Sequence, residues 1–325
     1  MTNVLILSAG RRVELTQRFK AARDRLNIDG KVVAADISDM APAIYFADKF
    51  YLIPAIGEEN YISSVIDICR KEKIDLIVPT IDTELLILAE NREEIENSTG
   101  AKVLLSDNRV IKICRDKNNT QDFFEENNFG VPKLLTHKEI EKGEYSFPLF
   151  IKPEDGSSSI NTFKINNAKE LKFFSEYIDK PIIQEYMSGK EFSIDVFCDF
   201  ESNPITIVPR ERISMRSGEI AKGVINKDRE IIDDVNRLIS ILKPIGHITI
   251  QCMKTDEGIK YIEINPRFGG GAPMSIDAGA DSCENLYRIL RGEKLSYNEN
   301  YKDGNVFLRF DSSIMLNENM ELCND

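Results

Sequence analysis

The sequence has no tryptophan and only two histidines, His137 and His247, among its 325 residues. So few imidazoles exclude a histidine-rich metal centre and disfavour a catalytic triad that contains histidine. Six cysteines are scattered along the chain without any Cys-x-x-Cys pair, a pattern that predicts neither a zinc site nor a disulfide framework. Most of them stand among apolar residues, as the reduced thiols of a hydrophobic core do.

Long apolar segments are absent too, because no stretch approaches the roughly 18 apolar residues that cross a membrane. The first residues enter a strand-like segment without a basic leader, which favours a cytoplasmic location. With a net charge of −12, the chain is a poor candidate for binding nucleic acid or an anionic membrane surface. Its length predicts about two domains.

Two common nucleotide-binding motifs are missing as well. No Gly-x-Gly-x-x-Gly follows the first strand-like segment, and no Gly-x-x-x-x-Gly-Lys-[Ser/Thr] is present. A dinucleotide site of the Rossmann type is therefore not expected. Arg11 and Arg12 stand instead where the first helix should begin. There they either hold an anion, such as a substrate carboxylate, or form a solvated first turn.

Strand-like and helical segments alternate in the first third of the chain. The apolar, strand-like segments end near Ser8, Asp36, Pro79 and Leu105, and helical segments separate them. This alternation predicts a parallel, doubly wound sheet, in which ligands gather at the carboxyl ends of the strands. Further along, two short helices are followed by strands in antiparallel order, which predicts an α+β region and a domain boundary near residue 110.

A β-hairpin is predicted over residues 246–265, where two alternating segments flank the polar turn 255–258. Its alternation places Glu263 and Asn265 on one face, and Gln251 on the neighbouring strand can share that face. One carboxylate and two amides form an oxygen-only ligand set, which suits a Mg²⁺ ion completed by water and phosphate. An ordinary hairpin with one wet face is the alternative.

Two segments of the second region are candidates for holding a nucleotide. Lys152 ends the strand-like segment before the small-residue loop 154–159, whose backbone N–H groups can surround phosphates. Over residues 182–191 a strand leads to a turn, where an extended backbone can hydrogen-bond an adenine edge and Glu191 can bind ribose hydroxyls. Loops rich in glycine and serine are common, however, and Glu191 can equally be an exposed acid at the start of a strand.

Charged residues that follow indicate where a second substrate binds. Arg210 is a candidate to hold a transferring phosphate or an acidic substrate, and Glu219 is a candidate to receive an amine. The alternative is a charged hairpin on the surface. After the predicted metal-binding hairpin come Arg267 and the glycines 269–271, which let the backbone approach a ligand and open a helix whose N–H groups can bind a carboxylate.

Taken in order, these motifs resemble an ATP-grasp domain from about residue 117 to 310, with the synthetase halves of the carbamoyl phosphate synthase large chain as the nearest kin. The resemblance implies an α/β plus α+β fold, in which a Rossmann-like, pre-ATP-grasp domain precedes the two α+β subdomains of the ATP-grasp fold. It places the first domain at residues 1–110 and the ATP-grasp domain at 111–312. Within the latter it places a lid at about 133–186, and residues 313–325 form a tail.

The same resemblance implies roles for particular residues. The ATP ligands would be Lys117, Lys152, Ser157, Ser158, Gln184, Glu185, Met187 and Glu191. The ligands of two Mg²⁺ ions, with Mn²⁺ as an alternative metal, would be Gln251, Glu263 and Asn265, with Glu263 bridging. Of the three catalytic candidates, the resemblance implies that Arg267 holds the transferring phosphate or the substrate and that Lys152 contacts phosphate, while Arg210 is the candidate chosen above from its own position. The candidates for contacting the second substrate are Arg11, Arg12, Glu219, Gly270 and Gly271.

The resemblance also implies the reaction. ATP-grasp enzymes typically convert a carboxylate into an acylphosphate, which an amine then attacks to give an amide, ADP and phosphate. This needs no protein nucleophile, in keeping with the missing Ser-His and Cys-His pairs. The expected partners are a small-molecule carboxylate and an amine, and the chain is a candidate homodimer. Two alternatives remain: a carbamoyl- or carboxyphosphate-forming synthase subunit, and a regulatory protein that binds ATP without turnover.

Overall fold

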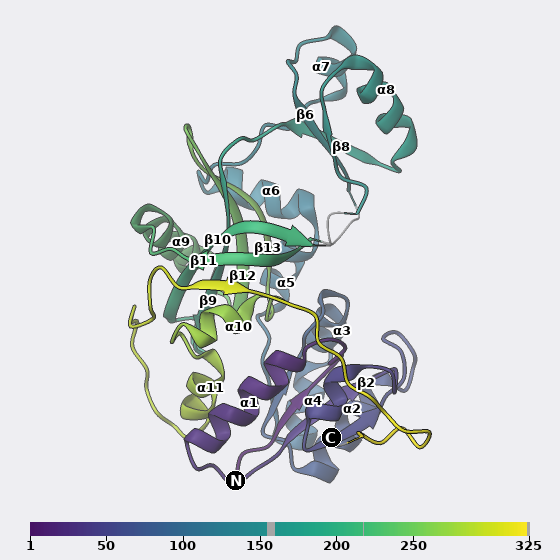
Figure 1. Cartoon of the computed structure of the whole chain (residues 1–325), viewed down its shortest axis with the longest axis vertical. Helices are drawn as coiled ribbons and strands as arrows, with labels where there is room; N and C mark the ends of the chain where they lie inside the picture. Colours follow the sequence, from purple (N-terminus) through teal and green to yellow (C-terminus); the bar gives the residue numbers. More distant parts are fainter. Residues whose placement is uncertain (155–159, 217, 324–325) are drawn as a thin grey trace.

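The computed structural model describes residues 1–325 except 155–159, 217 and 324–325. Three sheets organise these residues. Figure 1 shows a parallel sheet with its helices at one end of the molecule, an antiparallel sheet in the middle and a small lobe at the opposite end. No helix of the described residues is long and apolar enough to cross a membrane.

The N-terminal sheet has five parallel strands in the order β3-β2-β1-β4-β5. They are β1 (Val4–Ile6), β2 (Val32–Asp36), β3 (Lys49–Leu52), β4 (Leu76–Val78) and β5 (Lys102–Val103). The residues of β1, β2 and β4 are buried, as strands covered on both faces are. The predicted parallel, doubly wound sheet is confirmed. Strand β3 was not predicted, because its mostly exposed residues at the sheet edge lack a buried-strand pattern.

Helices cover both faces of this sheet. One face packs against α1 (Val13–Arg25), and the other packs against α2 (Tyr61–Glu72), α3 (Leu85–Glu90) and α4 (Arg92–Thr99). Short 3-10 helices, η1 (Pro42–Phe46) and η2 (Asp82–Glu84), follow β2 and β4. Because β1 and β4 are neighbours, α1 and η2 begin side by side at the carboxyl edge of the sheet.

Glu84 connects the loops at this edge. Its fully buried carboxylate accepts hydrogen bonds from Ser8 Oγ at 2.7 Å, from the Tyr61 hydroxyl at 3.0 Å and from the backbone N–H of Thr80 at 2.8 Å. The Thr80 hydroxyl in turn donates to the carbonyl of Ser8 at 2.7 Å. Burial raises the pKa of Glu84, although these hydrogen bonds act to lower it. The loops after β1 and β4 therefore form one connected surface.

The central sheet has the order β13-β12-β9-β10-β11-β14 and is antiparallel throughout. Its strands are β9 (Lys190–Cys198), β10 (Pro204–Arg216), β11 (Glu219–Ile225), β12 (Gly246–Thr255), β13 (Gly258–Asn265) and β14 (Val306–Leu308). A hydrophobic core joins the sheet to α5 (Asn108–Arg115), α6 (Lys117–Glu126) and α9 (Arg229–Leu242). The predicted hairpin is present as β12 and β13, with Gln251 opposite Glu263.

Among its described residues, the small lobe has a three-stranded sheet and two helices. Its strands are β6 (Leu149–Pro153), β7 (Phe163–Ile165) and β8 (Pro181–Glu185), and its helices are α7 (His137–Lys142) and α8 (Ala168–Tyr177). Six buried side chains form a core within the lobe, separate from the cores of the other two sheets. The domain and lid boundaries expected from the sequence stay predictions.

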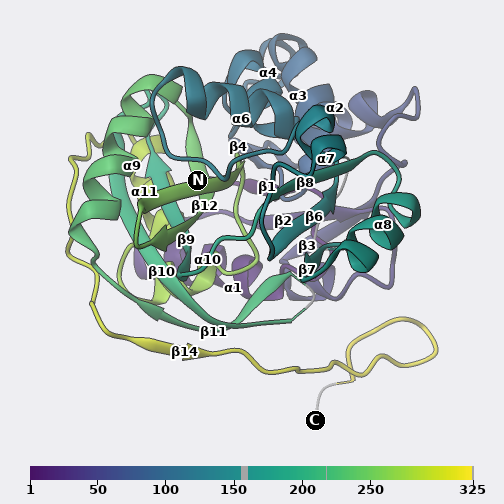
Figure 2. The same ribbon diagram turned by 90° about the horizontal axis from the view of Figure 1, so that it is seen from above.

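The C-terminal part of the chain returns to both larger sheets. Helices α10 (Ala272–Asp277) and α11 (Ser282–Leu290) pack against α1 of the N-terminal sheet. An extended segment then leads to β14, which pairs with β11 at the edge of the central sheet. Figure 2 shows β14 running along β11 on the rim of the molecule.

Candidate active site

Two pockets lie against the central sheet and meet. The first, of about 450 Å³, lies between the small lobe and the sheet, and the second, of about 430 Å³, lies between the sheet and the carboxyl edge of the N-terminal sheet. We name them the nucleotide pocket and the acceptor pocket. Both are lined by Lys117, Gly218, Gln251, Ile262 and Glu263. A molecule in one pocket would therefore face a molecule in the other across this shared set.

The nucleotide pocket has the walls that a flat, apolar ring needs. Its apolar lining includes Phe150, Ile160, Met187, Met253 and Ile262. Gln184 on β8 lies at the same pocket and is 3% exposed, and its buried Oε1 has no hydrogen-bond partner among the described residues. A buried acceptor without a partner is costly, so a ligand that supplies an N–H group there would be favoured.

Lys117 lines both pockets, whereas Lys152 lines the nucleotide pocket. Lys117, the first residue of α6, donates from Nζ to the carbonyls of Pro153 and Glu154 at 3.1 and 2.9 Å. Burial and the like charge of Lys117 lower the pKa of Lys152 to about 8, although Glu263 acts to raise it. Two cations at such close range favour an anionic ligand, whose charge would relieve their repulsion.

Glu191 lines the nucleotide pocket in an ion pair with Arg212. The Arg212 Nε atom lies 3.1 Å from the Glu191 carboxylate, and Arg212 also donates to Ser193 Oγ at 3.0 Å and to the carbonyl of Gly218 at 2.8 Å. Burial raises the pKa of Glu191, against the effect of the Arg212 charge. Arg212 was not predicted as a site residue, because its pairing with Glu191 depends on the register of β9 and β10.

The three predicted metal ligands lie together on β12 and β13. Gln251 Nε2 and Asn265 Nδ2 donate to the same oxygen, Glu263 Oε1, at 2.5 and 2.8 Å. No group of three or more His, Cys, Asp or Glu residues that could hold a metal is found in the described ranges. One carboxylate and two amides nonetheless fit a hard cation, because Mg²⁺ needs few protein ligands when phosphate and water supply the rest.

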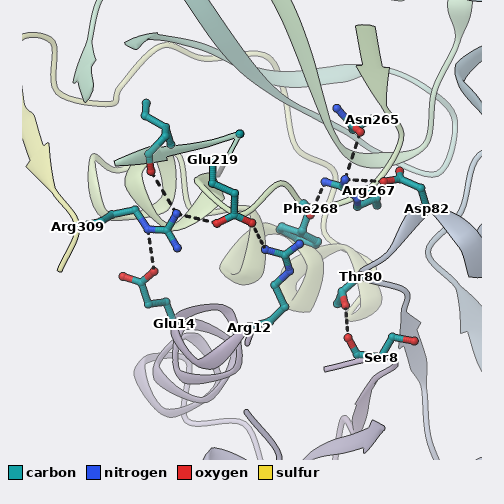
Figure 3. Close-up of polar contacts among 12 residues, drawn as sticks. Ser8, Arg12, Glu14, Thr80, Asp82, Glu219, Asn265, Arg267, Phe268 and Arg309 are labelled. Carbon is teal, nitrogen blue, oxygen red and sulfur yellow. Dashed lines mark hydrogen bonds and ion pairs between the residues drawn. The ribbon is translucent and has the colours of Figure 1, made fainter. Parts of the chain in front are cut away.

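Arg267 links this triad to the N-terminal sheet (Figure 3). Its Nη2 atom donates to Asp82 Oδ2 at 2.6 Å and to Asn265 Oδ1 at 3.2 Å, and Nη1 donates to the carbonyl of Phe268 at 3.2 Å. The buried Nε atom has no partner in the described part of the chain. No role was predicted for Asp82. It follows β4, however, and ligands were expected at the carboxyl ends of these strands.

The Arg210 guanidinium is buried and bound mainly to another side chain of the protein. It is 2% exposed, and its Nε and Nη2 atoms each donate to Asp195 at 2.8 Å. Asp195 also accepts from Thr249 Oγ1 and Ser275 Oγ, at 2.9 and 2.5 Å. Burial acts to raise the pKa of Asp195, but Arg210 and its hydrogen bonds lower it well below its usual range. Arg210 therefore touches the acceptor pocket mainly through Nη1.

The outer wall of the acceptor pocket is built from charged side chains of separate elements (Figure 3). Glu219 Oε1 accepts from Arg12 Nη1 at 3.3 Å, and Glu219 Oε2 accepts from Arg309 Nη1 at 2.9 Å. A Cβ atom on Gly270 would lie 2.5 Å from Glu219 Oε1 and 2.8 Å from Arg12 Nη1. A larger residue at this position would therefore displace the Glu219 and Arg12 side chains. Arg309 gave no sequence signal of any kind.

The remaining predicted residues are distributed differently. Gly271 lies against Arg210, since a Cβ there would come 2.4 Å from Arg210 Nη1. Arg11 is exposed and lines neither pocket. The Glu185 carboxylate accepts from Lys260 Nζ at 2.7 Å and is not part of the nucleotide-pocket lining. Ser157 and Ser158 lie outside the described residues.

Comparison with protein families agrees with this geometry. Residues 4–104 match the PylC-like N-terminal domain, and residues 114–271 match the ATP-grasp domain. The chain contains an ATP-grasp domain. The resemblance inferred from the sequence is thereby confirmed, and the ATP-grasp match includes the predicted metal ligands and most of the lining of the nucleotide pocket.

The ATP-grasp region also carries the similarity to curated proteins. The chain is 30% identical over 146 residues to a D-alanine–D-alanine ligase of Francisella tularensis subsp. novicida, which covers 41% of this chain and 49% of that protein. It is 26% identical over 156 residues to a carbamoyl-phosphate synthase of Methanobrevibacter smithii, which covers 46% of this chain and 41% of that protein. The chain thus spans about half the length of the curated relatives it matches.

The fold that includes the ATP-grasp domain is shared with solved structures. The biotin carboxylase domain dimer of the Hydrogenobacter thermophilus 2-oxoglutarate carboxylase matches with a TM-score of 0.71 and 18% identity, over 94% of this chain and 73% of that one. That crystal structure contains MgADP, ADP and bicarbonate. At this identity the likeness shows the fold, and it confirms the predicted combination of a parallel sheet with antiparallel sheets.

Proposed function

We propose that the chain is an ATP-dependent ligase that activates a small-molecule carboxylate as an acylphosphate and transfers the acyl group to an amine. The observation that carries this proposal is the junction of the two pockets at Lys117, Gln251 and Glu263. A nucleotide with its ring among the apolar residues and its phosphates at the junction would present the terminal phosphate to the acceptor pocket. Direct transfer to a carboxylate there needs no protein nucleophile.

The nucleotide pocket supplies recognition at one end and charge at the other. The unpartnered Gln184 Oε1 would accept from the exocyclic amino group of adenine, and Glu191 would accept from ribose hydroxyls while Arg212 fixes its position. Lys117 and Lys152 would contact phosphate oxygens and neutralise the charge that develops during transfer. Because Lys152 has a lowered pKa, binding of phosphate would also draw a proton to it at alkaline pH.

Gln251, Glu263 and Asn265 are the residues that would hold the metal, with two Mg²⁺ ions proposed and Mn²⁺ as a substitute. Bound there, Mg²⁺ would neutralise phosphate charge and align the transferring group. In the present arrangement both amide nitrogens point to Glu263. A cation beside Glu263 would favour the reversed amide of Gln251, which presents its oxygen. Asn265 Oδ1 already accepts from Arg267 Nη2, so Asn265 would need to turn away from Arg267 to bind the cation.

Arg267 would hold the carboxylate or the transferring phosphate on the acceptor side. Asp82 fixes its guanidinium by the contact at 2.6 Å, and the buried Nε atom without a partner adds an N–H donor that a ligand oxygen could use. Arg12, Gly270 and Glu219 bound the far end of the same pocket. Catalysis would then rest on positioning and charge, with Arg210 contributing through Nη1.

One alternative within the same fold has a specific observation behind it. The biotin carboxylase domain described above contains bicarbonate with its nucleotide, and a carboxyphosphate-forming enzyme would use the same junction of pockets. The D-alanine–D-alanine ligase relative supports the carboxylate–amine reading instead. The two reactions differ in the acid that accepts the terminal phosphate, which is an organic carboxylate in one and bicarbonate in the other. Bicarbonate therefore has to be included in any test.

The test measures ADP release with Mg-ATP and hydroxylamine across a panel of carboxylates that includes bicarbonate. Hydroxylamine intercepts an acylphosphate as a hydroxamate, and mass spectrometry then identifies the acid. A hydroxamate is the expected result. ADP release that depends on bicarbonate alone would favour the carboxyphosphate alternative. If no acid of the panel gives ADP release or a hydroxamate while Mg-ATP still binds, the ligase proposal is overturned in favour of a regulatory ATP-binding protein.

We also propose the domain division at residue 110 and a homodimer in solution. The biotin carboxylase domain that shares the fold was crystallised as a dimer. Light scattering coupled to size-exclusion chromatography measures the assembly directly. A mass near 37 kDa, that of one chain, would contradict the dimer.

A further inference from the structure

The segment after α11 contacts the wall of the acceptor pocket although it is far away in the sequence. Strand β14 pairs with β11, and the backbone N–H of Arg309 donates to the carbonyl of Ala221 at 2.9 Å. Asp311 accepts two hydrogen bonds from Arg216 on β10, at 2.5 and 2.8 Å. The pairing of β14 with β11 holds the backbone at Arg309, whose side chain donates to Glu219 (Figure 3). The Arg216–Asp311 pair is exposed, and among the described residues its side chains form no hydrogen bond with Arg309 or Glu219.

Glu219 is shared between two guanidinium groups. Its Oε2 accepts from Arg309 Nη1 at 2.9 Å, whereas the contact of its Oε1 with Arg12 Nη1 is longer, at 3.3 Å. The hydrogen bond from Arg309 and the charge of Arg12 lower the pKa of Glu219, although burial acts to raise it. Glu14, the acidic residue beyond Arg309, lies 3.8 Å from Arg309 Nε and is half exposed, so that pair is weaker.

Arg12 faces the acceptor pocket and Arg309 does not. Arg12, Glu219 and Gly270 line that pocket, whereas Arg309 lines a separate recess of about 160 Å³ on the other side of Gly270. The side chain of Arg12 is 20% exposed, and among the described residues Glu219 is its acidic partner. A guanidinium and a carboxylate prefer to form two parallel hydrogen bonds. In the structure Arg309 donates to one oxygen of Glu219, and Arg12 makes a single, longer contact with the other.

We propose that Arg309 holds Glu219 away from a bidentate pair with Arg12, and that Arg12 thereby binds an anionic group of the substrate at the end of the pocket remote from the phosphates. The group would be a carboxylate or a phosphate ester, in addition to the carboxylate that is activated. This inference rests on the proposed ligase function and names the substrate class of its acceptor pocket. Arg12 would touch the substrate, and Arg309 would be a positioning residue.

The substrate class is tested by matched pairs of acids that differ in one remote anionic group. ADP release with Mg-ATP and hydroxylamine is measured for glutarate against its half-amide, for malate against malamate, and for 3-phosphoglycerate against glycerate. The member with two anionic groups is expected to exceed its partner by about tenfold or more in kcat/KM, the worth of one charge-assisted hydrogen bond. The first two pairs report a carboxylate and the third reports a phosphate ester.

The role of Arg309 is tested by a suppressor. Arg309→Gln should lower kcat/KM for the acids with two anionic groups by about tenfold through KM, because Glu219 then pairs fully with Arg12. Adding Glu219→Gln to this variant removes the competing carboxylate and should restore the preference for these acids. If Arg309 only stabilised the local structure, adding Glu219→Gln would not restore that preference. The KM for Mg-ATP should stay constant in both variants.

Arg216→Gln is the matched control, since it removes a guanidinium that contacts the same segment at Asp311 but not Glu219. It should leave the charge preference unchanged, and thermal unfolding of each variant checks that the fold is intact. Equal turnover of both members of all pairs would overturn this inference and leave the ligase proposal standing. Loss of all turnover in Arg309→Gln/Glu219→Gln would also overturn it, because Glu219 would then contact substrate itself. Absence of ADP release from every acid would overturn both proposals.

Discussion

The nucleotide pocket and the acceptor pocket share a boundary but are assembled in different ways. The nucleotide pocket is lined by residues from 117 to 263, most of them on successive strands. The acceptor pocket brings together residues that are far apart in sequence: Arg12 and Glu219 are separated by 207 in residue number, and Asp82 and Arg267 by 185. The first can be recognised from local motifs, whereas the second depends on how the sheets are placed relative to one another.

The largest effect is expected where the two pockets meet. Glu263→Gln should lower ADP release at least about a thousandfold, because the only carboxylate of the proposed metal set is lost at the centre of charge transfer. Activity is measured as ADP release, and circular dichroism shows whether the fold is retained. Glu257→Gln, at the exposed turn of the same hairpin, should retain activity. Near-normal turnover in Glu263→Gln would contradict the metal assignment.

A substitution on the acceptor side should separate the two pockets. Asp82→Asn weakens the contact with Arg267 Nη2, so the KM for the acid should rise by about tenfold or more while the KM for Mg-ATP stays constant. Steady-state kinetics in both substrates measures this. Asp67→Asn on the exposed side of α2 is the control. An equal rise in both KM values would mean that the pockets do not act separately.

The converse substitution is on the nucleotide side. Gln184→Leu removes the buried acceptor without a partner, so Mg-ATP should bind about tenfold more weakly, as measured by titration calorimetry. The nucleotide-free protein should become more stable, by on the order of 1 kcal/mol, because a desolvated polar atom is replaced by an apolar group. Unchanged affinity would exclude contact between Gln184 and the nucleotide.

The smallest effect is a pH dependence from Lys152. Its pKa is about 8 without nucleotide, and phosphate binding should raise it, so affinity for Mg-ATP should be level below pH 8 and fall by at most about tenfold per pH unit above it. The same lowered pKa makes the charged lysine costly in the folded state. Stability of the nucleotide-free protein should therefore rise from pH 8 toward the normal lysine range. Lys152→Arg stays charged and should show neither trend.

The same contrast explains what the sequence could predict. Alternating segments revealed the parallel sheet and the β12–β13 hairpin, because both periodicities are local. Edge strand β3 was missed because its mostly exposed residues show no periodic pattern of apolar side chains. Arg212 and Arg309 were missed for another reason: an arginine pairs with whichever acid the strand register brings near it. Their partners, Glu191 and Glu219, were predicted as site residues. The sequence could not show that each of them is bound by a guanidinium group of the protein.

The closed core of the small lobe has a consequence for the exchange of ADP for ATP. The lobe buries its aliphatic side chains against one another, so tilting it away from the central sheet would expose none of that core to water. The contacts that tie it to the rest of the molecule include polar ones, such as Lys117 with the end of β6 and Lys260 with Glu185. Such contacts can be exchanged for water at little cost. In the proposed ligase, product release would then proceed by a rigid-body rotation of the lobe, and its rate should depend on salt more than on denaturant.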